Sequence, residues 1–138
     1  MQDIIVFCGL IFLLLIFPLQ DIRDTAIASK LEAFDAAVHT SVNIARLDGY
    51  FTGDNKSDLR DAIEAAFPEV DASSIVINVT DDRPRYRTNV YETRELIYYE
   101  ISVPVEDVIF MGRFLGIPDN LNSFTYEKKS FVTSERLP

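Results

Sequence analysis

The sequence has few of the residues on which most catalytic and metal sites depend. Cys8 is the only cysteine and His39 the only histidine, which excludes an intrachain disulfide and a cysteine-based metal cluster. A catalytic triad would need His39, which falls in a predicted helix, away from any strand-end loop. The five glycines are scattered and form no phosphate-binding loop. We therefore expect no metal, no cofactor and no enzymatic activity.

Basic residues are also scarce. The chain has 13 Lys and Arg against 22 Asp and Glu, and its formal net charge is −9. Asp3 is the only charged residue before residue 21, so nearly all of this negative charge lies on the rest of the chain. Such a surface repels nucleic acid and anionic lipid headgroups, and no basic patch reverses it. We expect no nucleic-acid partner.

The most informative feature present is the apolar run Ile4–Leu19, which contains no charged residue. A helix that is apolar on all sides is buried on all sides, either in lipid or among copies of itself. The run is shorter than the roughly 20 residues of an ordinary membrane span. It also lacks the basic flank of a signal peptide, because Arg23 is the first basic residue. We interpret Cys8, inside the run, as a small apolar residue, with lipidation or an intersubunit disulfide as alternatives.

From residue 20 the pattern becomes amphipathic and keeps helical spacing to Asp48. Apolar residues recur every three or four positions in one stripe, and Gly49 can take the left-handed conformation that ends a helix. A continuous helix from Asp3 to Asp48 would be about 69 Å long. Pro18 lacks a backbone donor, which predicts a kink near the end of the apolar run. The stripe residues expected to pack the helix on a head are Ile27, Leu31, Phe34, Val38 and Val42.

The remaining residues show short helical and strand patterns. The spacing of Leu59, Ile63 and Phe67 predicts a second helix, capped by Asp54 or Asn55. Alternating apolar residues predict strands, which we place at 74–80, 86–91, 95–105 and 124–134, and residues 108–115 are interpreted as a helical turn or a packed loop.

This order of elements predicts an α+β fold. A stem helix over 1–49, apolar at 4–19 and amphipathic at 20–48, is expected to pack on an α+β head over 50–138. The head would contain the short helix and an antiparallel sheet of three or four strands.

Two sites fit the Asn-X-Ser/Thr sequon for glycosylation, at Asn55 and Asn78. A sequon this short often occurs by chance. Asn78 lies in a predicted strand, so Asn55 is the better candidate of the two.

The stem resembles a known family in several features. The passage from Phe17 through Pro18 to Ile22, the acidic Asp3 and the apolar-then-amphipathic pattern resemble the type IV pilin-like superfamily, which includes the TadE-like pseudopilins. The resemblance covers residues 3–49 by pattern and the rest of the chain by element order. Asp3 stands where the family usually has glutamate, and no basic leader precedes the run. The chain therefore resembles an atypical pilin or pseudopilin.

The resemblance implies roles for residues near the N-terminus. Asp3 would pair with the terminal amine of an adjacent subunit and set the register of assembly, since a carboxylate among apolar helices needs a partner. The residues implied in packing between subunits are Ile4, Ile5, Phe7, Gly9, Leu10, Ile11, Leu14 and Phe17.

The leading functional hypothesis is a structural one. A pilin-like subunit would wait in the inner or cytoplasmic membrane and then polymerise through its N-terminal helix into an extracellular filament at the cell surface. Its implied partners are copies of itself in a helical homopolymer, the membrane before assembly, and a pilus assembly machinery. The alternative is a single-span membrane-anchored adaptor or pseudopilin of a secretion or pilus machine, which would display a small binding head.

Overall fold

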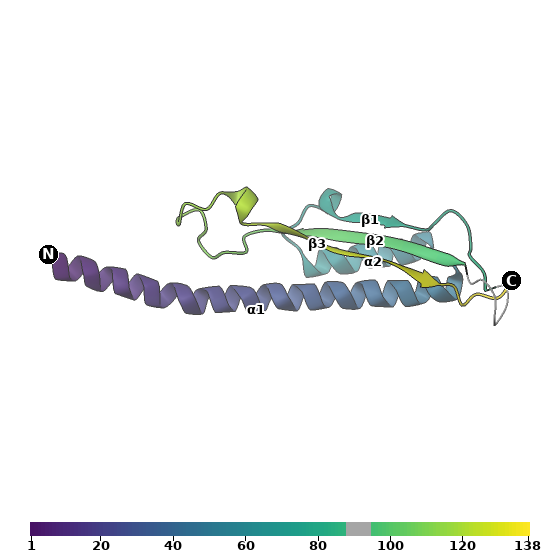
Figure 1. Cartoon of the computed structure of the whole chain (residues 1–138), viewed down its shortest axis with the longest axis horizontal. Coiled ribbons are helices and arrows are strands. Elements are labelled where there is room, and N and C mark those ends of the chain that lie inside the picture. Colours follow the sequence, from purple (N-terminus) through teal and green to yellow (C-terminus); the bar gives the residue numbers. More distant parts are fainter. Residues whose placement is uncertain (88–94) are drawn as a thin grey trace. The chain divides into compact units, whose positions relative to one another are not determined.

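The described residues form a long helix, a shorter helix and a three-stranded sheet (Figure 1). The computed structural model describes residues 1–87 and 95–138. Its main elements are α1 (Gln2–Asp48), α2 (Gly53–Ala66), β1 (Val76–Val79), β2 (Leu96–Val105) and β3 (Phe124–Thr133), and the short helices η1 (Ala72–Ser74) and η2 (Asp119–Leu121) precede β1 and β3. This arrangement confirms the predicted α+β fold with its long N-terminal helix, second short helix and antiparallel sheet.

Helix α1 runs without interruption through the apolar run and the amphipathic segment. Pro18 lies inside it and has no N–H to donate to the carbonyl of Leu14, one turn earlier; the kink predicted there stays a prediction. The helix ends where the sequence predicts, because Gly49 has φ 84° and its N–H donates to the Ala45 carbonyl at 2.8 Å. A Cβ at Gly49 would lie 2.3 Å from the carbonyl oxygen of Arg85, so only glycine fits.

The chain divides into two compact units. The first comprises Met1–Lys30 and Val105–Phe124, and the second comprises Leu31–Pro104 and Thr125–Pro138. Helix α1 contributes residues to both. These units do not coincide with the predicted stem (1–49) and head (50–138), because the connection between β2 and β3 packs on the N-terminal part of α1.

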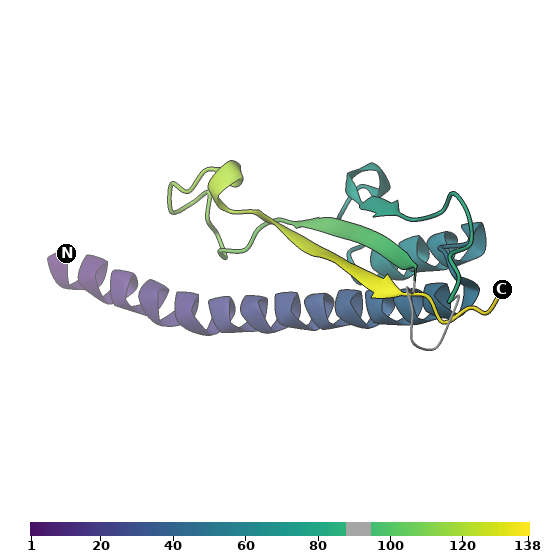
Figure 2. The same ribbon diagram turned by 45° about the vertical axis from the view of Figure 1, so that its right-hand side comes forward.

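The second unit holds nearly all of the apolar core. Its strand order is β1-β2-β3, and β1 pairs antiparallel with β2 from Val76↔Ser102 to Val79↔Tyr99. The buried residues of β2 share one parity, so both helices pack on the same face of the sheet, as Figures 1 and 2 show. The buried apolar side chains of this unit are Phe34, Val38, Val42, Ala45, Phe51, Leu59, Ile63, Phe67, Ile75, Ile97, Ile101 and Val103.

Helix α2 begins with a different cap from the predicted one. Thr52 is the N-cap residue, and its Oγ1 accepts a hydrogen bond from the Asn55 N–H at 3.2 Å. The prediction of Asp54 or Asn55 as the cap is therefore wrong. Asp54 lies in the first turn of the helix, and the Asn55 side chain is buried against Ser41 of α1.

Three predicted strands are confirmed, with slightly shorter bounds, as β1, β2 and β3. The strand predicted at 86–91 lies largely outside the described residues. Pro104 is tolerated near the end of the central strand for a geometric reason. Tyr98 exchanges hydrogen bonds with Thr80, so the N–H groups of the even-numbered residues of β2 point towards β1. The pairing with β1 ends at Ser102. Pro104 therefore lies where an N–H would have no partner on β1, and its missing N–H costs no hydrogen bond of the sheet.

In the first unit, residues 106–123 connect β2 to β3 and lie along α1 (Figures 1 and 2). We call this connection the 106–123 loop. It consists of hydrogen-bonded turns over residues 110–116 followed by η2. Of the two alternatives expected for residues 108–115, the packed loop of turns is the one observed.

Candidate functional site

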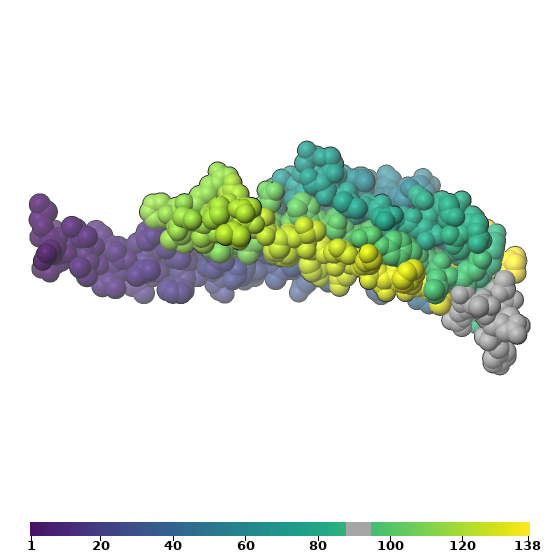
Figure 3. Space-filling model, turned by 45° about the horizontal axis from the view of Figure 1, so that its top comes forward, coloured from purple at the N-terminus to yellow at the C-terminus, as the bar shows by residue number. Residues whose placement is uncertain are grey.

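The N-terminal part of α1 exposes an extended apolar surface. We call residues 4–19 the apolar surface of α1, drawn in purple at one end of Figure 3. None of the most apolar 18-residue window of α1 is buried. By length and composition the helix can cross a membrane, which is typical of a membrane anchor or a signal sequence. All the residues implied in packing between subunits are exposed: Ile4, Ile5, Phe7, Gly9, Leu10, Ile11, Leu14 and Phe17.

Asp3 lies at the end of the apolar surface of α1. It is an exposed residue in the first turn of the helix, where a negative charge interacts favourably with the helix dipole. Its predicted partner, the terminal amine of another subunit, is not part of a single chain. The assembly role of Asp3 therefore stays a prediction.

One side of α1 is covered by the 106–123 loop. The half-buried residues of this part of the helix are Ile16, Gln20, Arg23, Ile27 and Lys30. They recur at helical spacing, so they form one stripe, and Gln20 and Arg23 of this stripe contact the loop. Phe12 extends the stripe, because its ring centroid lies 5.4 Å from that of Phe114. The side chains of Leu14 and Phe17, 71% and 73% exposed, lie off the stripe.

Gln20 joins the loop to the helix. Its Oε1 accepts a hydrogen bond from the Phe110 N–H at 2.7 Å, and its Nε2 donates to the Val108 carbonyl at 3.0 Å and to Asp24 Oδ1 at 2.7 Å. Gln20 is the first polar residue after the apolar run. Both polar atoms of its side chain are therefore bonded at the level where that run ends.

Arg23 holds the beginning of the loop. Its Nε donates to the carbonyl of Asp107 at 2.7 Å, and its Nη2 donates to the carbonyl of Glu106 at 3.3 Å. These bonds go to the backbone of the loop and do not depend on its side chains. One turn of α1, from Gln20 to Arg23, thus binds the first residues after β2.

Asn122 closes the loop on itself. Its side chain accepts from the Ile109 N–H and donates to the Ile109 carbonyl, while its backbone carbonyl accepts from the Val108 N–H at 3.1 Å. Asn122 is 3% exposed. A Cβ at Gly112 would lie 2.6 Å from Asn122 Nδ2, so this close approach requires glycine. The loop is a closed, internally bonded element.

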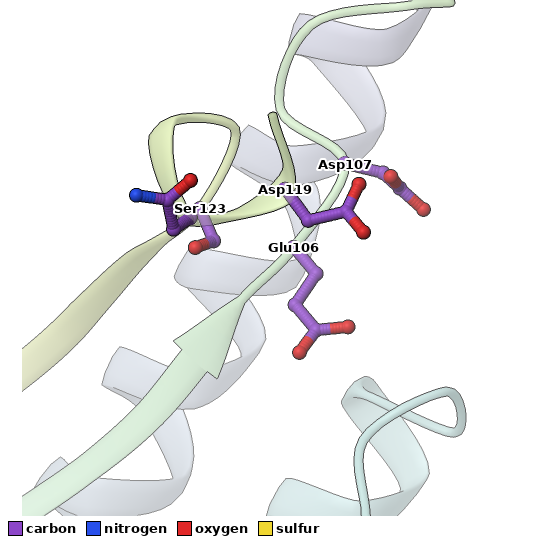
Figure 4. Close-up of a pocket in the computed structure, with 5 residues that line it drawn as sticks. Glu106, Asp107, Asp119 and Ser123 are labelled. Atoms are coloured by element: carbon purple, nitrogen blue, oxygen red, sulfur yellow. The ribbon is translucent and has the colours of Figure 1, made fainter. Parts of the chain in front are cut away.

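An acidic hollow of about 320 Å³ lies on the loop, and Figure 4 shows the side chains that line it. Glu106, Asp107 and Asp119 contribute carboxylates. Asp119 receives two hydrogen bonds of 2.7 Å from Arg113, which hold the pKa of its carboxyl below the usual value. Among residues 1–87 and 95–138, no group of three or more His, Cys, Asp or Glu side chains could hold a metal ion. The hollow is a solvated acidic surface.

Three of the five stripe residues predicted to pack on the head, Phe34, Val38 and Val42, are buried in the second unit. Leu31 is half-buried there, and Ile27 is half-buried in the first unit.

The Phe34 ring meets the Tyr126 ring of β3 edge-on, at 5.4 Å between centroids. The Tyr126 hydroxyl donates to Asp35, and Lys128 lies 3.4 Å from the same carboxylate, whose charge raises the pKa of Lys128. Aromatic packing and charge thus join α1 to β3.

The structure reverses the order of the two sequon candidates. Asn55 is 4% exposed, its Nδ2 donates to the Ser41 carbonyl at 2.9 Å, and its Oδ1 accepts from the Ser41 hydroxyl at 2.7 Å. A glycan on Asn55 would break this buried pair, so the preference for Asn55 is wrong for the folded chain. Asn78 is exposed and donates to Glu100 at 3.3 Å.

Sequence reasoning missed the loop as part of the site. The sequence does carry a signal, because residues 108–115 are apolar without belonging to a predicted strand, and such a segment needs a surface to cover. Which surface it covers depends on contacts between residues about 90 positions apart, such as Gln20 with Phe110. Comparisons with protein-family models, curated proteins and solved structures give no match.

Proposed function

We propose that this chain is a pilin-like structural subunit that polymerises through α1 into an extracellular filament. Before assembly, α1 would hold the chain in the membrane, and a pilus assembly machinery would extract it. In the filament, copies of the chain would cover the apolar surface of α1. The proposed role is structural and includes no catalysis.

The observation that carries this proposal is the exposure of the apolar surface of α1, on which only Ile16 is half-buried. Burying a large apolar side chain contributes about 1.5–3 kcal/mol. The seven large side chains implied in packing between subunits, from Ile4 to Phe17, would together contribute about 10–20 kcal/mol before ordering costs. Since the described part of the chain leaves these seven side chains exposed, lipid or other copies must cover them.

Asp3 favours covering by copies. A carboxylate at the apolar end of a helix is costly to bury without a partner. In a parallel bundle, the terminal amine of a neighbouring copy can supply that partner, and the pair then fixes the offset between subunits. A plain membrane anchor gives this carboxylate no comparable role.

A second candidate is a single-span membrane-anchored adaptor. The observation that favours it is the loop that contacts α1 at Phe12, Gln20 and Arg23. A chain that stays in the membrane as a monomer could use such a loop at the point where its helix leaves the bilayer. This candidate needs α1 as a span but needs no contact between copies.

Electron microscopy of sheared cell-surface material, with mass spectrometry of its main protein band, separates the two candidates. We expect thin filaments composed mostly of this chain. Recovery of the chain only in membranes, as a monomer, would refute the filament and favour the adaptor.

The variant Asp3→Ala tests the assembly mechanism. We expect it to abolish filaments while circular dichroism of the purified chain stays native. The matched control is Asp21→Ala, which removes another exposed carboxylate from α1 outside the apolar surface. Filaments of normal number and length from Asp3→Ala would remove Asp3 from the mechanism.

A further inference from the structure

We propose that the 106–123 loop is a membrane-inserting element, which places its turn at Met111–Leu115 among the lipid acyl chains beside α1. The occupant of this apolar turn is thus lipid. The inference rests on the membrane-held state in the proposed function and does not depend on polymerisation.

The contacts along α1 set the depth of the loop. The loop leaves β2 beside Arg23, passes Gln20, and reaches Phe12 through Phe114. Eight residues of helix separate Gln20 from Phe12, which corresponds to about 12 Å along the axis. The turn therefore runs back along the apolar run towards the N-terminus. If residues 4–19 span a bilayer, Phe114 lies near the middle of that run, at the depth of the lipid acyl chains.

The side chains of the turn suit this position. Phe114 is 68% exposed although its ring rests on Phe12, and Met111 and Leu115 are exposed as well. These three side chains of the turn extend the apolar surface of α1 on the side that the loop covers. Figure 3 shows the loop against the helix there. In water this exposed apolar surface would favour aggregation, whereas among acyl chains it adds apolar area to that of the helix.

Part of the loop backbone is bonded within the protein, and in the turn itself the N–H groups of Gly112 and Leu115 have partners. Non-helical backbone is tolerated at membrane depth only where its polar groups are bonded within the protein. Phe110 donates to Gln20, and Ile109 donates to Asn122. Further backbone donors with partners inside the loop are the N–H groups of Val108, Gly112, Leu115, Gly116, Ile117, Leu121 and Asn122.

The charged residue of the turn is paired within the loop. Arg113, next to Phe114, forms a two-pronged ion pair with Asp119 at 2.7 Å for both bonds, which leaves little net charge beside the turn. Figure 4 shows Asp107 and Asp119 beside Glu106 on the acidic hollow. Because acidic groups repel anionic headgroups, insertion should rest on apolar contact and should occur in zwitterionic lipid.

Tryptophan fluorescence can test this placement directly, because the chain contains no tryptophan. The full chain is reconstituted in nanodiscs of phosphatidylcholine, with or without bromine on the acyl chains, and carries one tryptophan at a time. Phe114→Trp and Leu115→Trp probe the turn at two positions, so that one disturbed side chain does not decide the result. Phe7→Trp reports on the apolar surface of α1. Phe131→Trp, at a β3 residue of similar exposure (60%), is the matched control.

We expect brominated lipid to quench Phe7→Trp strongly, to quench both turn variants, and to leave Phe131→Trp unchanged. Because Phe114 lies about 12 Å from the level of Gln20, bromine in the inner half of the acyl chains should quench the turn at least as strongly as bromine near the headgroups. Quenching of Phe7→Trp without quenching of either turn variant would overturn this inference alone. No quenching of Phe7→Trp would overturn the membrane-held state as well. A blue-shifted but unquenched turn would mean that a second copy covers it, which also refutes the lipid placement.

Discussion

Gln20 should be the strongest single attachment between the 106–123 loop and α1. In the variant Gln20→Leu, a side chain of similar size keeps the apolar contact but removes the bonds to Phe110 and Val108. A lost hydrogen bond costs about 0.5–1.5 kcal/mol, and a half-buried N–H left without a partner costs about 1–3 kcal/mol. Together these values predict that docking of the loop weakens by about 2–4 kcal/mol.

Hydrogen exchange of the loop amides measures this change. The loop opens from the helix locally, and its protected amides exchange through that opening. Since 1.4 kcal/mol corresponds to a factor of ten, exchange around Phe110 should accelerate roughly 30- to 700-fold. Exchange in the second unit, for example at Ile101, should not change.

The matched control is Gln2→Leu, the same chemical change at an exposed position at the other end of the apolar run. It should leave exchange of the loop at the wild-type rate. If Gln20→Leu also left the loop amides unchanged, the Gln20 bonds would not hold the loop, and docking would have to rest on Phe12 and Phe114 alone.

Three further predictions concern the second unit. Deleting residues 1–22 removes none of its buried apolar side chains, so size-exclusion chromatography and circular dichroism should show a soluble monomer with native sheet content; an unfolded product would contradict the division into units. Gly49→Ala forces a Cβ against a backbone carbonyl at a residue in the left-handed conformation. It should lower the free energy of unfolding, measured by urea denaturation, by about 1–3 kcal/mol. The control Gly53→Ala, with no atom within 4 Å of its Cβ, should be near neutral. A hydrogen bond from the Tyr98 hydroxyl lowers the pKa of Glu100. The contribution of this hydrogen bond to the free energy of unfolding should therefore be complete above the ordinary carboxyl pKa of about 4. It should be lost as the pH falls through the lowered pKa. If the urea midpoint of Glu100→Gln fell equally steeply with pH, this role of Glu100 would be refuted.

Local patterns were sufficient for the elements of the fold. The apolar spacing from residue 20 onwards predicted one continuous helix, and Gly49 predicted its end, because a left-handed residue after a helix favours glycine whatever surrounds it. Alternation predicted the strands for the same local reason. The cap of α2 was predicted wrongly because Thr52 and Asn55 are both competent caps, and only the buried contact of Asn55 with Ser41 removes it from the choice.

The two sequons differ in burial, which their sequence motif does not show. The two sequons are equivalent as motifs, yet Asn55 is buried between α1 and α2 and Asn78 is exposed on β1. Likewise, residues 108–115 were apolar without an assigned partner. Their partner on α1 could not be predicted, because it lies about 90 residues away and is selected by the shape of the turn and by Gln20.

The sequence by itself determined that residues 4–19 need an apolar environment, since a helix without a polar side cannot remain in water. It also determined the order of helices and strands, through spacing that each segment carries alone. Only the tertiary structure decided which side of α1 is already covered. The 106–123 loop contacts the stripe at Phe12, Gln20 and Arg23 and leaves the side of Leu14 and Phe17 for lipid or for other copies. The physical reason is that contacts between distant segments depend on the packed shape of both, and that shape exists only once the chain has folded.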